Sequence, residues 1–178
     1  MPLPAEPVGP PADISPVVRP ADPSEYDHLR SIEVASDRLL EEFGIGPFVE
    51  DESEDHLPTA AAVFAAGEPA VGFVCVELVD GQAHIDQLSV LPEHGRRGIG
   101  RALVETAVGW AAASGYDELT LTTYRDVPFN APFYRTLGFR EVADLGPELA
   151  AIRAHERELG DDGFGPRVAM RRLLRQPT

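Results

Sequence analysis

Alternation of apolar and polar residues predicts three β-strands in the middle of the chain. Residues 60–66, 70–79 and 82–91 are rich in apolar and β-branched side chains. A Gly-Glu-Pro turn follows the first run, and Asp80-Gly81 separates the second run from the third. Because Asp-Gly between two such runs is typical of a two-residue hairpin, we expect these two strands to be antiparallel neighbours.

A helical periodicity precedes these strands. Leu29, Ile32, Ser36, Leu39 and Phe43 recur every three or four residues, so they share one face of a helix, which we expect to be buried. An Asp-Pro-Ser sequence provides the start of this helix, since proline suits the first turn. Glycines and a proline soon after Phe43 end it.

The second half of the chain alternates helices with strands. We expect helices at 98–114, 128–137 and 147–159, strands at 118–123, 139–143 and 167–174, and a short edge strand at 17–19. A strand reached through a helix usually runs parallel to the strand before that helix. Strand 118–123 should therefore be parallel to strand 82–91.

Together these elements predict an α+β fold, with a mixed, mostly antiparallel central sheet flanked by helices and one parallel strand pair. The chain has 178 residues, which suits one domain with a sizeable core. We place this domain at residues 16–175. Residues 1–15 are rich in proline, and we expect them to form a disordered tail.

Charge and composition restrict the classes of binding partner that we expect. The net charge is −15 and the isoelectric point is about 4.6, so nucleic acid and anionic membranes are not expected partners. Cys75 is the only cysteine, which excludes an intrachain disulfide and fits a small core residue. No run of residues is long enough to span a bilayer, and the first residues do not have the pattern of a signal peptide, so we expect a cytoplasmic protein.

One turn carries the strongest chemical signal. Residues 88–101 read Leu-Ser-Val-Leu-Pro-Glu-His-Gly-Arg-Arg-Gly-Ile-Gly-Arg and join a strand to a helix. The first amides of a helix have no internal acceptor, and the helix dipole is positive there, so such a turn binds anions. Gly98 and Gly100 allow a pyrophosphate to come close to the backbone, and Arg96, Arg97 and Arg101 add positive charge. The alternative is an ordinary surface turn.

Two common nucleotide sites do not fit this turn. A P-loop needs a lysine after its last glycine, but all 15 basic residues of the chain are arginine. A dinucleotide fingerprint needs a third glycine where Leu103 stands. The turn therefore predicts a pyrophosphate site of another type.

A second motif, Asn-Ala-Pro-Phe-Tyr-Arg-Thr-Leu-Gly-Phe, occupies residues 130–139. With the glycine turn and the order of elements, it makes residues 16 to about 175 resemble the GNAT superfamily of N-acetyltransferases. The chain departs from the family at Gly95, where the family's first motif has Arg or Gln. Arg96 and Arg97 follow it and can supply the charge.

The resemblance implies that an acetyl group passes from acetyl-CoA to a primary amine of a small molecule or peptide, by direct attack in a ternary complex. In the family, two central parallel strands splay apart, and the pantetheine arm pairs with the exposed backbone. The matching positions are Leu88 and Val90, whose side chains should be core; the Leu88 amide would polarise the thioester carbonyl. Asn130 and Phe133 would contact the coenzyme, although Asn130 also suits a helix N-cap.

The reaction needs a base to deprotonate the amine and an acid for the departing thiolate. Alternation along a strand puts His84, Asp86 and Leu88 on one face. Branches of the family carry a catalytic glutamate or histidines at the positions of His84 and Asp86, so the resemblance implies that the base is His84, Asp86 or a water chain. A neighbouring carboxylate should raise the proton affinity of His84. The alternative for His84 is a histidine in a satisfied hydrogen bond.

Tyr134 matches the family's general acid. A phenol has a pKa of about 10, above the roughly 8.5 of a thiol, so it would keep its proton until the thiolate forms. The alternative is a core aromatic residue.

An acidic stretch should line the acceptor site, because in the family the first helix and the loop after it usually wall that site. Residues 22–55 contain 12 acidic residues and 2 arginines. Glu33 and Asp37 would face a cationic acceptor, such as a polyamine, an aminoglycoside or a basic peptide; the alternative is a solvated charged face. The other acidic candidates are Glu41, Glu42, Asp51, Glu52, Glu54 and Asp55.

The remaining expectations are negative or open. No histidine has metal-ligand spacing to a second candidate, so we expect no metal and place His28, His56, His94 and His155 on the surface. A protein or peptide N-terminal acetyltransferase and a non-catalytic acyl-CoA-binding module remain the alternative functions. A homodimer is an expectation by analogy with the family. The sequence does not identify the acceptor.

Overall fold

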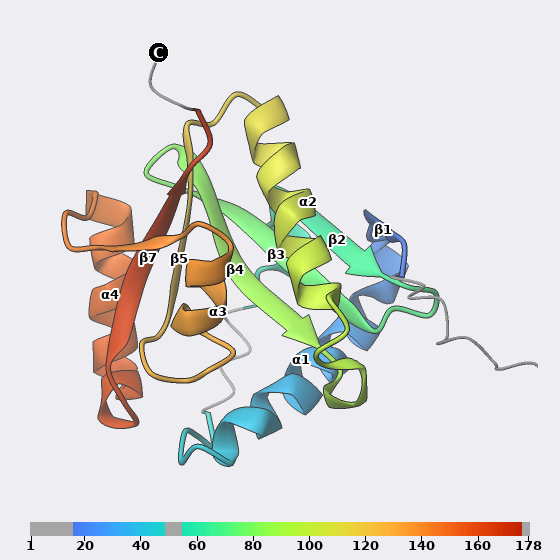
Figure 1. Cartoon of the computed structure of the whole chain (residues 1–178), viewed down its shortest axis with the longest axis horizontal. Coiled ribbons are helices and arrows are strands. Elements are labelled where there is room, and N and C mark those ends of the chain that lie inside the picture. The colour runs from blue at the N-terminus through green and yellow to red at the C-terminus, as the bar shows by residue number, and fades with distance from the viewer. Residues whose placement is uncertain (1–15, 49–54, 176–178) are drawn as a thin grey trace, which may run out of the picture.

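The computed structural model of the chain describes residues 16–48 and 55–175, which are built around one seven-stranded sheet. The strands lie side by side in the order β1-β2-β3-β4-β5-β7-β6 (Figure 1). Each predicted strand is present, with ends shifted by at most two residues. The bounds are β1 Val18–Pro20, β2 Ala62–Ala66, β3 Gly72–Val79, β4 Gln82–Val90, β5 Glu118–Tyr124, β6 Arg140–Val142 and β7 Arg167–Leu173.

Neighbouring strands are antiparallel except for the central pair, β4 and β5, which is parallel. The turn between β3 and β4 is made by Asp80 and Gly81, whose φ angles are +53° and +70°. Positive φ at both positions is what a tight hairpin of this hand requires. The predicted mixed, mostly antiparallel sheet with one parallel pair is therefore confirmed.

Helices cover both faces of the sheet (Figure 1). The long helices are α1 (Tyr26–Glu41), α2 (Ile99–Ala113) and α4 (Pro147–Leu159), and α3 (Ala131–Thr136) is short. Alternate side chains of β3 separate the two faces: Val74 and Val76 pack in the cluster beneath α2 and α3, whereas Phe73 and Cys75 pack beneath α1. The expectation that Cys75 is a core residue is confirmed, since it is 1% exposed.

The predicted buried face of α1 is correct at its start and wrong at its end. Leu29 and Ile32 are fully buried, whereas Phe43 is 48% exposed. Phe43 lies beyond the last residue of the helix, so helical periodicity no longer directs it to the core. Its ring instead packs edge-on against Phe129, with 5.5 Å between ring centroids.

Some predictions fall on residues outside the described ranges. They are the tail at 1–15 and the acidic residues Asp51, Glu52 and Glu54. Among the helices of residues 16–48 and 55–175, none has the length and apolar character needed to cross a membrane.

Candidate active site

A gap opens between β4 and β5 at the centre of the sheet. The two strands pair only at Ala83–Leu119, His84–Thr120 and Ile85–Leu121, although β4 continues to Val90. Residues 87–90 are therefore paired on the β3 side alone. We call their other side, which faces away from β3, the gap edge.

The gap edge carries the amides of Leu88 and Val90. The amide of Leu91 donates to the Val71 carbonyl at 2.8 Å, toward the β3 side. Because hydrogen-bonded and non-hydrogen-bonded positions alternate in an antiparallel pair, the amides at 90 and 88 point the other way. The side chains of Leu88 and Val90 pack against the core cluster beneath α2, as predicted.

A β-bulge interrupts β4 beside the gap. Cys75 faces Gln87 and Val76 faces Ile85, so Asp86 is an extra residue with no partner position on β3. One extra residue breaks the alternation of side chains along a strand. Asp86 lies beside His56 on the α1 face, whereas Leu88 packs on the α2 face. The prediction that His84, Asp86 and Leu88 share one face is therefore wrong for Leu88.

The glycine turn presents unbonded amides at the end of the gap edge. Within the part of the chain that the structure describes, the amides of residues 96–101 donate to no acceptor, and the first backbone hydrogen bond at the helix start runs from the Ala102 amide to the Gly98 carbonyl. Arg96 and Gly98 have φ angles of +60° and +79°. Left-handed residues that alternate with residues of negative φ turn successive amides toward a common point, which is an anion-binding arrangement.

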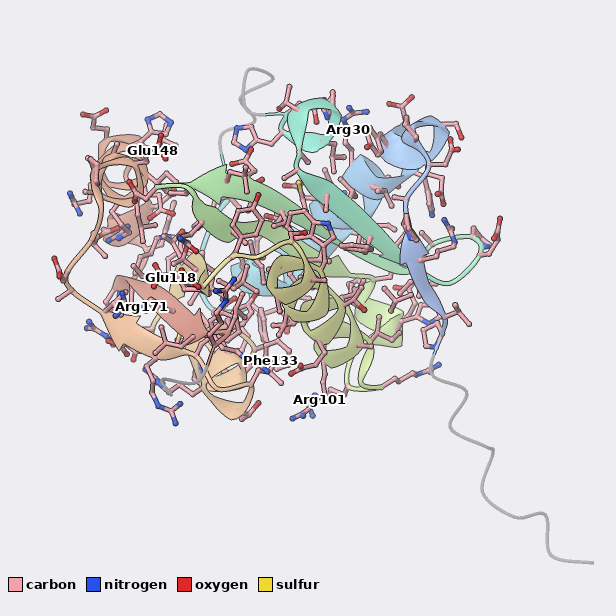
Figure 2. The ribbon with its side chains drawn as sticks, turned by 90° about the horizontal axis from the view of Figure 1, so that it is seen from above. Arg30, Arg101, Glu118, Phe133, Glu148 and Arg171 are labelled. Carbon is pink, nitrogen blue, oxygen red and sulfur yellow. The ribbon has the colours of Figure 1, made fainter. Side chains whose placement is uncertain are left out.

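Three arginines surround these amides. Arg96, Arg97 and Arg101 are exposed, and none forms an ion pair with a described residue. Figure 2 shows Arg101 reaching outward near the start of α2, close to Phe133. A Cβ atom added to Gly100 would lie 3.5 Å from Cζ of Phe133, so α3 packs directly against the turn. The structure thus brings the two sequence motifs together.

Helix α3 places Asn130 and Tyr134 one turn apart. Asn130 is at the N-cap position, but its side chain makes no capping hydrogen bond. The side chain is therefore not engaged in the capping role that the sequence suggests. Tyr134 is 7% exposed, and its ring packs edge-on against Phe133 and Phe139. Burial raises the pKa of the Tyr134 phenol, which is therefore neutral and retains its proton at physiological pH.

His84 is enclosed in the sheet. It is 3% exposed, and its Nδ1 lies 2.8 Å from Oγ1 of Thr120 on β5. Burial lowers the pKa of His84 to about 4, and the smaller opposing effect of Asp86 does not compensate. The carboxylate of Asp86 does raise the proton affinity of His84, as predicted, but the net shift is downward because desolvation of the imidazolium outweighs it. The predicted alternative, a histidine in a hydrogen bond, describes its contacts.

The acidic face of α1 turns toward β4. Burial raises the pKa of Glu33 to about 7, and the carboxylates of Asp37 and Asp86 add to the rise. Burial also raises the pKa of Asp37 to about 6. Both groups are half-buried. An arriving cation would favour their ionised forms, because it supplies the charge that this face lacks.

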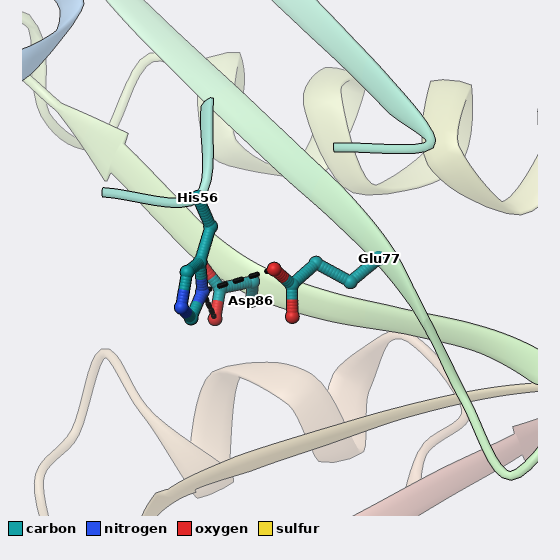
Figure 3. A group of neighbouring side chains, drawn as sticks. All are labelled: His56, Glu77 and Asp86. Carbon is teal, nitrogen blue, oxygen red and sulfur yellow. Dashed lines mark ion pairs between the residues drawn. The ribbon is translucent and has the colours of Figure 1, made fainter. Parts of the chain in front are cut away.

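A further cluster lies at the bulge and was not predicted. Nδ1 of His56 is 3.0 Å from a carboxylate oxygen of Glu77 on β3 and 3.1 Å from one of Asp86 (Figure 3). His56 is 38% exposed at its side chain, so its predicted surface position is only half correct. The three residues come from three segments, so no spacing in the sequence signals them. Only the register of β3 against β4 brings the carboxylates together.

Comparison with known proteins agrees with this geometry. The family model described as "Acetyltransferase (GNAT) family" matches residues 24–139, from before α1 to the end of the α3 motif. A rat protein, N-acetyltransferase family 8 member 3, is 36% identical over 64 residues, which are 36% of this chain and 28% of that protein. The chain thus matches well under two thirds of that relative.

Solved structures share the fold. An acetyltransferase of the GNAT family from Staphylococcus aureus Mu50 has a TM-score of 0.66 at 17% identity, over 89% of this chain and 99% of that one. N-acetylglutamate synthase from Neisseria gonorrhoeae, in complex with coenzyme A and N-acetylglutamate, has a TM-score of 0.66 at 19% identity. The match covers 90% of this chain and 35% of the synthase.

Proposed function

The chain belongs to the acetyltransferase (GNAT) family, and from this premise we propose that it transfers an acetyl group from acetyl-CoA to a primary amine. The observation that carries the proposal is the run of unbonded amides at residues 96–101, which leads onto the gap edge of β4. One surface can thus bind a diphosphate at the turn and an extended acyl-bearing arm along the strand.

In this proposal the turn binds the coenzyme pyrophosphate, with Arg96, Arg97 and Arg101 supplying positive charge around it. The pantetheine arm runs along the gap edge and bonds to the backbone of Leu88 and Val90, as an added strand would. The arm also contacts Asn130 and Phe133, which α3 holds beside the turn. Gly98 and Gly100 also belong to the proposed coenzyme site, because their lack of side chains leaves room for the phosphates.

The acetyl group then meets the amine at the gap edge. The Leu88 amide donates to the thioester carbonyl and stabilises the negative charge that develops on its oxygen. The amine nitrogen forms a bond to the carbonyl carbon, the carbon–sulfur bond breaks, and the thiolate takes the proton of the Tyr134 hydroxyl. A buried, neutral phenol suits this step because it holds its proton until the thiolate is present.

The amine must lose a proton before or during attack. Of the two predicted bases, Asp86 is the accessible one, since its side chain is 29% exposed at the bulge. His84 has a pKa of about 4 and is enclosed beside Thr120, so it is a weak base and does not readily pass a proton to solvent. We therefore assign the proton to Asp86 or to a water that it orients.

The acceptor in this proposal carries positive charge. The carboxylates of Asp37 on α1 and Asp86 on β4 both raise the pKa of Glu33, so they lie near it. In this proposal the three carboxylates line the acceptor site. An ammonium group entering that site would lower their pKa values and be held by them. Diamines, polyamines, aminoglycosides and basic peptides share this chemistry.

A release assay for free thiol tests the proposed function. Purified protein and acetyl-CoA are incubated with monoamines, diamines, polyamines, aminoglycosides and peptides with free N-termini, and mass spectrometry identifies the acetylated product. We expect amine-dependent thiol release, fastest for acceptors with two or more charges. Acetylation of peptides alone would indicate an N-terminal acetyltransferase, and tight coenzyme binding without release would contradict catalysis.

A further inference from the structure

We propose that His56, Glu77 and Asp86 form a binding site for one divalent transition-metal cation, on the α1 face of the sheet at the β4 bulge. The three ligand atoms are Nδ1 of His56 and one carboxylate oxygen from each acid, and they lie within 4.8 Å of one another (Figure 3). One imidazole with two carboxylates is a donor set that Zn²⁺, Co²⁺ and Mn²⁺ accept.

The spacing of the donors fits a shared ion. Two donor atoms bound at about 2.1 Å in perpendicular directions are about 3.0 Å apart. The Nδ1 atom of His56 is 3.0 Å from the Glu77 oxygen and 3.1 Å from the Asp86 oxygen. An ion could therefore bind all three atoms after small side-chain rotations.

A metal cation fits these three side chains better than a proton on Nδ1 of His56 does. Both carboxylates approach the same ring nitrogen, and that nitrogen can carry one hydrogen. One N–H cannot donate with good geometry to two acceptors in different directions. A cation at the centre contacts both carboxylates and the nitrogen lone pair at once.

The surroundings also favour a cation. Glu33 lies close enough to feel the charges of Asp86, Asp55 and His56. Arg30 on α1 forms its ion pairs with Asp27 and Asp55 and with no residue of the cluster. The cluster itself thus lacks a fixed positive charge.

The backbone holds the ligands in place, and each ligand side chain is partly exposed. Glu77 and Asp86 lie on the paired strands β3 and β4, and the bulge turns Asp86 toward Glu77. The ligand side chains are 38%, 23% and 29% exposed for His56, Glu77 and Asp86.

A bound ion would oppose the proposed transfer reaction. It would engage the Asp86 carboxylate and place two positive charges where a cationic acceptor must approach. This consequence rests on the proposed function, whereas binding of the ion does not. The site would therefore act as an inhibitory cation site.

Binding of Co²⁺ alone tests the site directly. The full chain is dialysed against a chelator and titrated with Co²⁺, followed by visible absorption and by calorimetry. We expect saturation at one ion per chain, and at least about tenfold weaker binding in His56→Gln, Glu77→Gln and Asp86→Asn. The control His155→Gln, an exposed histidine on α4, should bind as the wild type does. Thermal unfolding verifies that each variant folds.

Three outcomes would overturn the site. The first is that the wild type shows no saturable binding of Co²⁺. The second is that His56→Gln binds Co²⁺ as tightly as the wild type, and the third is that a diamine binds through Glu77 while Co²⁺ does not. The last result would assign the cluster to the acceptor. Once an acceptor is known, Zn²⁺ should inhibit transfer by the wild type and not by His56→Gln. Absent transfer activity with intact Co²⁺ binding would contradict the proposed function alone.

Discussion

The hydroxyl of Tyr134 is the residue-scale feature most open to a clean test. We expect Tyr134→Phe to lower kcat by about 100-fold, with little change in acetyl-CoA affinity, because the acid acts only as the thiolate leaves. The hydroxyl has no hydrogen bond to a described residue, so its removal should leave the melting temperature nearly unchanged. Steady-state kinetics and calorimetry measure both effects. Tyr116→Phe is the matched control, and an unchanged kcat in Tyr134→Phe would exclude the hydroxyl from the mechanism.

Gly98 is required for its backbone conformation as much as for space. A Cβ atom there would meet nothing within 4 Å, but its φ of +79° is one that L side chains rarely adopt. We expect Gly98→Ala to cost about 1–2 kcal/mol of stability and to weaken coenzyme binding as the turn relaxes. Gly109→Ala on the same helix should instead be neutral or stabilising, since it also meets nothing and needs no left-handed angle. Equal coenzyme affinity in both variants would contradict the phosphate role of the turn.

Glu33 should make stability depend on pH. Its folded-state pKa of about 7 lies above the ordinary value of the unfolded chain. At a pH between these two pKa values, the folded chain binds a proton on Glu33 that the unfolded chain does not. Stability from this group is therefore full at low pH and is lost as pH rises toward 7. We expect Glu33→Gln to exceed the wild type at pH 8 by on the order of 1 kcal/mol, after allowance for solvent screening, and to match it near pH 4. Chemical unfolding of both proteins measures this, with Glu41→Gln as control; a constant difference would contradict it.

At the scale of elements, the bulge in β4 sets the face on which each side chain of the site lies. Deleting Asp86 removes the extra residue, so one half of β4 must turn its side chains to the opposite face of the sheet. Apolar residues such as Ile85 or Leu88 would then leave the core cluster that they now join. We expect the deletion to unfold the protein or to lower its stability by several kcal/mol, whereas Asp86→Ala should fold. Thermal unfolding distinguishes the two, and a stable deletion variant would show that the bulge is dispensable.

Elements also differ in how far the sequence predicts them. The strands, the Asp80-Gly81 hairpin and the glycine turn were predicted because each depends on residues adjacent in the chain. The bulge was not, since no local pattern marks Asp86 as an extra residue. The clustering of His56 with Glu77 depends on how three segments pack, and the burial of His84 depends on the layers above it. These features exist only at the level of tertiary structure.

At the scale of the whole molecule, the acidic charge should steer cationic acceptors. The net charge of −15 is concentrated in residues 22–55, which include the α1 face of the site. We expect the KM of a polyamine-like acceptor to rise several-fold as salt increases, because screening shortens the reach of these charges. The KM of a monoamine should rise less. Initial rates across a salt series test this, and equal slopes for both acceptors would argue that the acidic face is only solvated.

The sheet exposes less unpaired backbone at its outer edges than at its central gap. The outermost strands, β1 and β6, contain three residues each, so the rim offers little backbone to another protein chain. The longer stretch of unsatisfied strand edge among the described residues lies in the interior, between β4 and β5. A slender extended molecule can enter there, whereas a neighbouring β-sheet cannot. The architecture thereby separates two properties that exposed strands usually combine, receptiveness to a ligand and a tendency to aggregate.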